Sequence, residues 1–458
     1  MPPAQTVLEA RWVVPVRPRA AVLEHHAAVL EGGRIADLLP IAEARLRYPQ
    51  ARRVALERHA LIPGMVNAHA HCAMSLLRGV GDDLPLHDWL QDRIWPLERA
   101  IVGPDFVYDG SRLAAAEMLR AGITCCNDMY FYPAEAAQGL RSVGLRAAVG
   151  ILAIDFPSRY ASDADDYLRQ GLAARDALLD DPLISFTIAP HAPYTVADGT
   201  LRRIAALAEE LDLPVHMHVH ETAQEVAQSL QQYGMRPLER LERLGLVSER
   251  LLAVHATQLL EAEIELLARR GAAVAHCPSS NLKLASGICP VARLLDAGTA
   301  VAIGTDGAAS NNRLDLLAEA GLAALLAKGA SGDARAMPSW AALESATLSG
   351  AKALGLEQRI GSIEVGKDAD LAALDLGEVE TQPCHDVISQ IIYCAGREHV
   401  TSVWVAGEQV LADRNIVHAG NGALTEEILR ASAPWQNHIR QRLREASVPR
   451  TSASETET

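Results

Sequence analysis

Eight short apolar runs, separated by segments with a helical pattern, constrain the fold of this chain more than any other feature of its sequence. Two of the separating segments are SRLAAAEMLRAG at residues 111–122 and LRRIAALAEELD at residues 201–212. Near-continuous apolar strands that alternate with helices are typical of a parallel sheet buried on both faces. Eight such units over roughly 250 residues predict an α/β fold, the (β/α)₈ TIM barrel. The runs are LIPGMVNAH, ITCCNDM, RAAVGILAI, ISFTIAPH, PVHMHVHE, LLAVHA, GAAVAHC and AVAIGTD.

The two ends of the chain follow a different pattern, which predicts a second, smaller domain. Near the N-terminus, AAVLEGGRIADLL is typical of two strands joined by a Gly-Gly turn. Near the C-terminus, TSVWVAGEQVLAD repeats this pattern with Gly407 and Glu408 at the turn, and KDADLAALDL adds another strand. Neither end alone has enough strands for a stable sheet. We therefore expect both ends to pair into one small β-sandwich domain.

The expected domain organisation has three parts. Residues 1–60 and 362–422 together form the discontinuous β-sandwich domain, and residues 61–361 form the barrel. Residues 423–458 contain a C-terminal helix and a tail, TSASETET, whose polar composition predicts disorder.

Composition excludes several classes of partner. The net charge is −15, with both signs mixed along the chain, which argues against nucleic acids and anionic membranes as partners. No apolar run approaches the roughly 20 residues of a membrane helix, and the N-terminus does not have the pattern of a signal peptide. The 7 cysteines include no CxxC motif, which favours free thiols in a reducing compartment. We expect a cytoplasmic protein.

Side chains that can bind a metal stand at the ends of most of the eight runs. In a barrel, functional groups collect at the carboxyl ends of the strands. His69 and His71 are two residues apart, so on a strand they face the same way and can bind one ion. Imidazoles with one carboxylate suit a divalent metal such as zinc. The joint pattern predicts a metal site, although a lone histidine is more often a core residue. Later runs end in His191, in HMHVHE, in His255 and in Asp306.

The fifth run contains three histidines, and its sequence does not show which of them binds the metal. His216, His218 and His220 alternate along the run, so all three face the same side of a strand. Position along the run favours the two later histidines, and spacing alone does not choose between them.

With these residues at its strand ends, the chain resembles the amidohydrolase superfamily. More narrowly, it is similar to the 5′-methylthioadenosine/S-adenosylhomocysteine deaminases, which are related to triazine hydrolases. The resemblance covers nearly the whole chain. Its motifs are PGMVNAHAH, WLQDRIWPLE, APHAPYT, HVHET, VHA, HCPSSNLKLASG, GTDGAASNN and GSIEVGKDADLAALD.

The resemblance implies one metal ion per chain, usually zinc. The His-x-x-Glu motif of the family fits His218 and Glu221, which leaves His216 and His220 as supporting residues. Binuclear relatives carry a lysine at the end of the fourth strand, where this chain reads TIAPHAPYT, so a mononuclear site follows. Ligand type alone does not distinguish zinc from iron or manganese. The implied ligands are His69, His71, His218 and Asp306.

The resemblance also implies a hydrolytic deamination, and the residue types suit that chemistry. A carboxylic acid beside the metal, Glu221, can give a proton to N1 of an adenine ring as water attacks C6. Asp306 can accept the proton of that water and pass it to departing ammonia. His255 can polarise or orient the water, or can be a supporting histidine.

The implied substrate-binding residues also have ordinary structural interpretations. Glu98 matches a position that accepts hydrogen bonds from ribose hydroxyls, but a solvated glutamate is the alternative. Trp89 would pack on the substrate or cap the barrel, and Ser310 would bond a purine nitrogen or cap a helix. His191 would contact the ribose side or the edge of the site. Arg159 would meet the charged tail of S-adenosylhomocysteine or be an exposed structural arginine.

We therefore expect a zinc-dependent deaminase that converts the adenine of 5′-methylthioadenosine, S-adenosylhomocysteine or adenosine to hypoxanthine, without a ranking of these nucleosides. Relatives suggest a homo-oligomer, a dimer or tetramer. One alternative is a guanine or 8-oxoguanine deaminase or a triazine hydrolase, which would not need Glu98. A remote alternative is an inactive amidohydrolase-like binding protein, against which the intact ligands and Glu221 argue.

Overall fold

The computed structural model describes residues 5–418 and 423–447, and its centre is a parallel sheet of eight strands. The strands follow one another in chain order, and the last lies against the first, so the sheet nearly closes into a barrel. Most of these strands consist only of buried residues, which confirms the predicted (β/α)₈ architecture. The strands are β5 (Met65–Ala70), β6 (Ile123–Asp128), β7 (Arg146–Ala153), β8 (Ile184–Pro190), β9 (Val215–Val219), β10 (Leu251–His255), β11 (Ala273–His276) and β12 (Ala300–Ile303).

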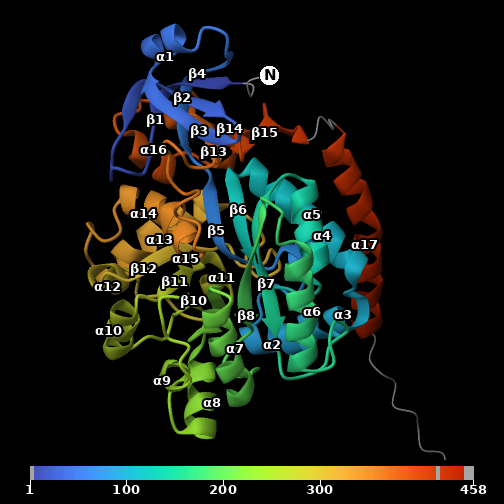
Figure 1. The fold of residues 1–458 in the computed structure, drawn as a ribbon. Helices are drawn as coiled ribbons and strands as arrows, with labels where there is room; N and C mark the ends of the chain where they lie inside the picture. The colour runs from blue at the N-terminus through green and yellow to red at the C-terminus, as the bar shows by residue number, and fades with distance from the viewer. Residues whose placement is uncertain (1–4, 419–422, 448–458) are drawn as a thin grey trace, which may run out of the picture.

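Helices cover the outside of the barrel between its strands (Figure 1). The first begins at Pro104, seven residues before the predicted start, because proline is favoured at the first helical position. The helices are α4 (Pro104–Arg120), α5 (Pro133–Ser142), α6 (Ala164–Ala177), α7 (Asp198–Glu210), α8 (Ala223–Tyr233), α9 (Pro237–Arg243), α10 (Glu261–Arg270), α11 (Pro278–Lys283), α12 (Val291–Asp296), α13 (Leu316–Ser331), α14 (Ser339–Ser345) and α15 (Leu348–Ala353).

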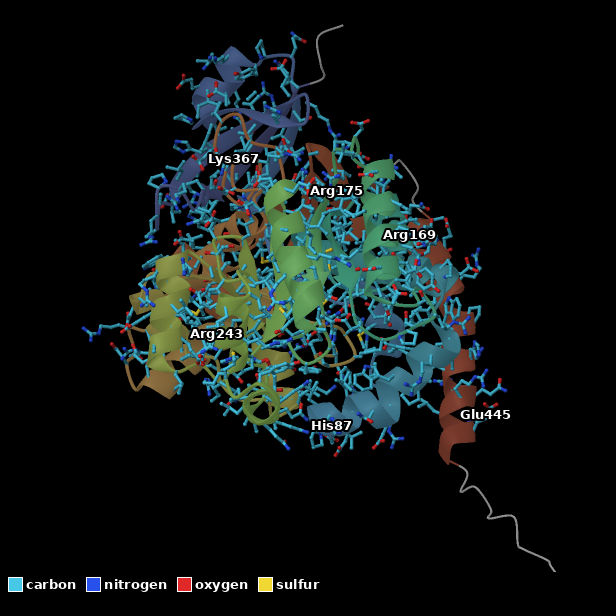
Figure 2. The ribbon with its side chains drawn as sticks, turned by 60° about the horizontal axis from the view of Figure 1, so that its bottom comes forward. His87, Arg169, Arg175, Arg243, Lys367 and Glu445 are labelled. Atoms are coloured by element: carbon cyan, nitrogen blue, oxygen red, sulfur yellow. The ribbon has the colours of Figure 1, made fainter. Side chains whose placement is uncertain are left out.

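A chain of short helical turns separates β5 from α4 and lies at the end of the barrel opposite the small sheet (Figure 1). It consists of η1 (Cys72–Leu77), α2 (Leu86–Trp89), the π-helical turn η2 (Leu90–Ile94) and α3 (Trp95–Ile101). In Figure 2, His87 of α2 lies on the surface at this end of the molecule. The segment carries two of the predicted substrate-binding residues, Trp89 and Glu98.

Strands from both chain ends form a separate eight-stranded mixed sheet, which confirms that the two ends share one small β-domain. β1 runs parallel to β4, and the other neighbours are antiparallel. The strands are β1 (Thr6–Val13), β2 (Leu23–Glu31), β3 (Arg34–Pro40), β4 (Arg52–Pro63), β13 (Leu371–Asp375), β14 (Val400–Val405), β15 (Glu408–Ala412) and β16 (Asn415–Ile416). Its short helices are α1 (Ile41–Arg47), η3 (Val379–Thr381), α16 (Val387–Tyr393) and η4 (Arg397–His399).

Both predicted hairpins are present in this sheet. The first turns at Gly32 and Gly33, whose φ values of 58° and 83° lie in the left-handed region that glycine adopts readily. The second turns at Ala406 and Gly407 rather than at Gly407 and Glu408, because Glu408 already pairs with Val405.

The first predicted barrel run is divided between the two sheets at Gly64. Leu61 and Ile62 pair with β13 in the small sheet, while β5 begins at Met65. A Cβ atom on Gly64 would lie 2.0 Å from Oγ1 of Thr124, so only glycine lets the chain pass this close to β6. Sequence pattern alone cannot locate such a crossing, because both parts of the run are apolar.

The last described helix, α17 (Leu424–Ser447), packs along α4 and reaches α3 and η1, as Figure 1 shows at the right side of the molecule. The predicted C-terminal helix is therefore present. The predicted disordered tail lies outside the described residues, and the domain boundaries stay a prediction. Within the described ranges, no helix is long and apolar enough to span a membrane.

Candidate metal centre and active site

The predicted metal ligands come together at the carboxyl ends of three barrel strands. Nε2 of His69 and Nε2 of His71 each lie 3.3 Å from Oδ1 of Asp306. Asp306 stands three residues after the end of β12. The ring of His218, on β9, lies 4.9 Å from the ring of His69. Potential ligand atoms of His69, His71 and Asp306 lie within 4.8 Å of one another, and so do those of His69, His218 and His255. His255 therefore borders the same cluster.

Three of these histidines use Nδ1 for a hydrogen bond inside the protein, which leaves Nε2 for a metal. A carbonyl partner requires Nδ1 to carry the proton, and this fixes the tautomer that ligates through Nε2. The partners of Nδ1 are Nε2 of His216 for His69 (2.8 Å), the carbonyl oxygen of Met129 for His71 (2.5 Å) and the carbonyl oxygen of His191 for His218 (2.7 Å).

The protonation states also fit a bound divalent cation. Burial lowers the pKa of His69 to about 4 and that of His218 well below its usual value, so both rings are neutral at pH 7. Burial alone would raise the pKa of Asp306, but the neighbouring histidines hold it well below its usual range. Nε2 of His69 is buried without a hydrogen-bond partner. Neutral imidazoles, an ionised carboxylate and this unpaired nitrogen are the donor set that zinc prefers.

Glu221 brings a second carboxyl group to the site, two residues after β9. Burial, followed by the charge of Asp306, raises the pKa of Glu221 to about 8, so this side chain is protonated at neutral pH. Oε2 of Glu221 lies 3.8 Å from Nε2 of His255. Nδ1 of His255 donates to Oδ1 of Asn281 at 2.8 Å, which fixes the orientation of its ring.

A serine holds Asp306 from the side away from the histidines. The hydroxyl of Ser280 donates to Oδ2 of Asp306 at 2.6 Å and lies 3.0 Å from the hydroxyl of Ser310. Ser310 is buried and also bonds the carbonyl oxygen of Gly307. It does not line the cavity described next, and it caps no helix, since Asp315 is the N-cap of α13. Its predicted contact with a purine nitrogen stays a prediction.

The cluster opens into a cavity of about 350 Å³ that has a mostly apolar lining. Glu98 of α3 lies in this cavity, and loss of hydration raises the pKa of its carboxyl to about 7. Oε1 of Glu98 accepts a hydrogen bond from the hydroxyl of Tyr130 at 2.8 Å. Trp89 is buried in the wall, where its Nε1 donates to the carbonyl oxygen of Val80.

Two other predicted binding residues line the same cavity. Nη1 of Arg159 donates to the carbonyl oxygen of Ala100 at 3.2 Å, so this arginine joins the loop after β7 to α3 at the cavity wall. His191 lies with its ring 4.9 Å from that of His218, and Thr195 bonds its Nδ1. Burial lowers the pKa of His191 to about 3, so it is neutral.

Sequence reasoning missed several residues that support the site. Ser280 and Asn281 stand in the motif HCPSSN directly after the seventh run, and polar residues at a strand end are a usable signal. Tyr130 follows the second run in the same way. Glu225 gave no such signal, because it lies inside a helix. Its carboxylate accepts the backbone N–H groups of His220 and Glu221 at 2.9 and 2.7 Å.

Comparison with known proteins agrees with this geometry. The model of the amidohydrolase family matches residues 60–410.

The chain belongs to the amidohydrolase family.

Two curated relatives of this amidohydrolase have the same name. This chain is 43% identical to a 5-methylthioadenosine/S-adenosylhomocysteine deaminase of Teredinibacter turnerae, over 94% of this chain and 97% of the relative. It is 44% identical to the corresponding protein of Saccharophagus degradans, over 95% of this chain and 97% of the relative.

Solved structures include a close neighbour and more distant ones. An adenosine deaminase from Xanthomonas campestris with bound zinc superposes with a TM-score of 0.93 at 53% identity, covering 96% of this chain and 99% of that one. An atrazine chlorohydrolase from Arthrobacter aurescens superposes with a TM-score of 0.86 at 22% identity, covering 94% of this chain and all of that one. At that identity the second likeness supports the fold alone.

Proposed function

We propose that this amidohydrolase is a zinc-dependent deaminase of adenine nucleosides. It converts the adenine of 5′-methylthioadenosine, S-adenosylhomocysteine or adenosine to hypoxanthine and releases ammonia. The names of the full-length relatives support this assignment, as does the zinc in the Xanthomonas campestris structure. The observation that carries the proposal is that Glu221, protonated at neutral pH, shares one cavity with the metal-binding cluster and with Glu98.

His69, His71, His218 and Asp306 would hold one zinc ion. The chemistry that such a metal supplies when bound is the activation of water as a nucleophile at neutral pH. The fixed Nδ1 bonds of the three histidines orient their rings toward one point. They therefore reduce the entropy lost when the ligands assemble.

The protein's own groups would move the protons of the reaction. As the oxygen of water attacks C6, Asp306 accepts one of its protons and Glu221 gives a proton to N1 of the ring. When the C6–N bond breaks, the amino group takes the proton from Asp306 and leaves as ammonia. The second water proton returns to Glu221 as the C6 carbonyl forms. His255, held by Asn281, orients the attacking water.

The remaining predicted binding residues would position the nucleoside. Glu98 accepts hydrogen bonds from the ribose hydroxyls, and Trp89 packs against the substrate. His191 contacts the ribose side and Ser310 a purine nitrogen. Arg159 is assigned to the charged tail of S-adenosylhomocysteine, because its guanidinium has one backbone partner and an exposed position at the cavity.

The decisive experiment follows turnover directly. Purified zinc-loaded protein is incubated with 5′-methylthioadenosine while the ultraviolet change from adenine to hypoxanthine and the release of ammonia are recorded. The wild-type protein should convert the substrate. The Glu221→Gln variant should lose at least about 100-fold in kcat, because a general acid contributes on that order. Its zinc content should equal that of the wild type, since Glu221 is outside the proposed ligand set.

Guanine, 8-oxoguanine and a chlorotriazine serve as competing substrates in the same assay. Turnover of one of these, without turnover of any adenine nucleoside, would reject the proposal. A zinc-replete protein that converts none of them would instead indicate a binding protein.

A further inference from the structure

Tyr130 is a cavity residue that the mechanism above does not use. It stands two residues after β6, and only 5% of its surface is exposed. Its hydroxyl donates to Oε1 of Glu98 at 2.8 Å, which joins the loop after β6 to α3. Burial raises the pKa of this hydroxyl well above its usual value, so the hydroxyl keeps its proton and acts as a donor.

This hydrogen bond leaves the two oxygens of Glu98 unequal. Oε1 is held by Tyr130, whereas Oε2 has no hydrogen-bond partner within the described residues. A carboxylate has about four lone-pair positions, so a Glu98 held in this way can still accept two further hydrogen bonds. Two neighbouring hydroxyl groups on a five-membered sugar ring are a matching pair of donors. A carboxylate free to rotate would lose this match, because both acceptors must be oriented at once.

We propose that Tyr130 is a specificity-determining residue that orients Glu98 so that the enzyme selects nucleosides with an intact 2′,3′-diol. The inference rests on the proposed function. Tyr130 acts through Glu98, and its own ring packs edge-on against Phe131 at 5.2 Å and His71 at 6.5 Å. A phenylalanine at this position keeps both ring contacts, so Tyr130→Phe removes only the hydroxyl.

The experiment compares adenosine with 2′-deoxyadenosine, which differ by one hydroxyl of the diol. The value measured is the ratio of kcat/KM for adenosine to kcat/KM for 2′-deoxyadenosine. In Tyr130→Phe this ratio should fall by about tenfold, as expected when a hydrogen bond to a charged group is lost. The change should come from a higher KM for adenosine, with kcat for both substrates close to the wild-type value.

Two further variants separate this role from a structural one. Tyr132 lies on the same loop and lines the same cavity, but its hydroxyl donates to the carbonyl oxygen of Arg159. Tyr132→Phe should therefore leave the ratio unchanged. In a Glu98→Gln background, Tyr130→Phe should have no further effect on the ratio, because a residue that acts only through Glu98 has nothing left to orient.

The possible results distinguish the inference from the proposed function. Equal losses for both substrates in Tyr130→Phe, or additive effects of the two substitutions, would overturn the inference. A wild-type protein that deaminates both substrates equally well would also overturn it and leave the proposed function standing. A wild-type protein that deaminates neither, nor 5′-methylthioadenosine, would reject the proposed function and the inference together.

Discussion

At the scale of single residues, Glu98 should make substrate capture depend on pH. Its pKa is raised to about 7 because the carboxyl is removed from water. Above that pH the carboxylate can accept the hydrogen bonds that we propose for the ribose hydroxyls, and below it the protonated form loses acceptor capacity. We therefore expect kcat/KM for adenosine to fall as pH decreases through about 7, since this parameter reports the free enzyme.

The control for this dependence is Glu98→Gln, whose amide does not titrate. The variant should have a lower kcat/KM for adenosine, and the acid-side decline near the pKa of Glu98 should disappear. A variant that keeps the same decline would assign it to another group. Adenine without ribose, if it is turned over, should not share this decline in either protein.

The role of Ser280 can be tested by substitution, because its hydroxyl donates a hydrogen bond of 2.6 Å to Oδ2 of Asp306. Ser280→Ala leaves Oδ2 of Asp306 without this donor in a buried site. We expect kcat to fall by about tenfold, as for the loss of a hydrogen bond to a charged acceptor. Ser279→Ala is the matched control, since Ser279 bonds Glu319 rather than Asp306. Equal kinetics in both variants would contradict the role of Ser280.

At the scale of elements, the barrel could be predicted from the sequence because most of its parallel strands are buried along their whole length. Seven of the eight runs correspond to one strand each, and the first is divided at Gly64. That division depends on the close approach of Gly64 to Thr124, which is a tertiary contact without a local pattern. The predicted start of α4 is too late for a different reason, which is local. The pattern considered only its alanine-rich part, whereas Pro104 begins the helix.

The site was predictable to the extent that it depends on strand ends. His69, His218, His255 and Asp306 are brought together by barrel closure, which needs no knowledge of the loops. The partners of these residues lie on loops and helices whose paths the sequence does not reveal. Thus the bond of Ser280 to Asp306 and that of Tyr130 to Glu98 appear only in three dimensions.

The connection between β9 and α8 carries Glu221, the proposed general acid. His220 has a φ of 55°, a left-handed conformation that costs energy for a residue with a Cβ atom. The buried carboxylate of Glu225 accepts the N–H groups of His220 and Glu221, and the hydroxyl of Thr257 donates to the carbonyl oxygen of Glu221. The backbone of the proposed acid is therefore held on both sides.

Glu225→Gln should loosen this connection, because an amide offers only one acceptor oxygen to two N–H donors. We expect kcat to fall by about tenfold or more through misplacement of Glu221, with little change in KM or zinc content. Glu210→Gln, on the exposed end of α7, is the matched control for the loss of one negative charge. If Glu225→Gln lowers kcat no more than the control does, the connection does not depend on this carboxylate.

At the scale of the whole molecule, the small sheet lies at the end of the barrel opposite α2 and α3, which carry residues that line the cavity (Figure 1). Arg146, the first residue of β7, is 1% exposed and joins the barrel to the segment that leads into β13 of the small sheet. Its guanidinium bonds both oxygens of Asp370 at 2.8 and 3.0 Å and one oxygen of Asp368 at 3.0 Å. These carboxylates precede β13, so one buried cation ties the C-terminal part of the small sheet to the barrel.

This arrangement predicts that stability and catalysis can be separated by one substitution. Arg146→Met leaves buried carboxylates without their partner and should lower the free energy of unfolding by about 3–5 kcal/mol. Arg203→Met, which removes an exposed ion pair with Asp165, should cost less than about 1 kcal/mol. Urea unfolding followed by tryptophan fluorescence measures both losses. Below the unfolding transition, kcat of Arg146→Met should stay close to the wild-type value, because the substitution lies far from the metal centre. A folded variant with greatly reduced kcat would show instead that the small sheet supports the active site through the barrel strands.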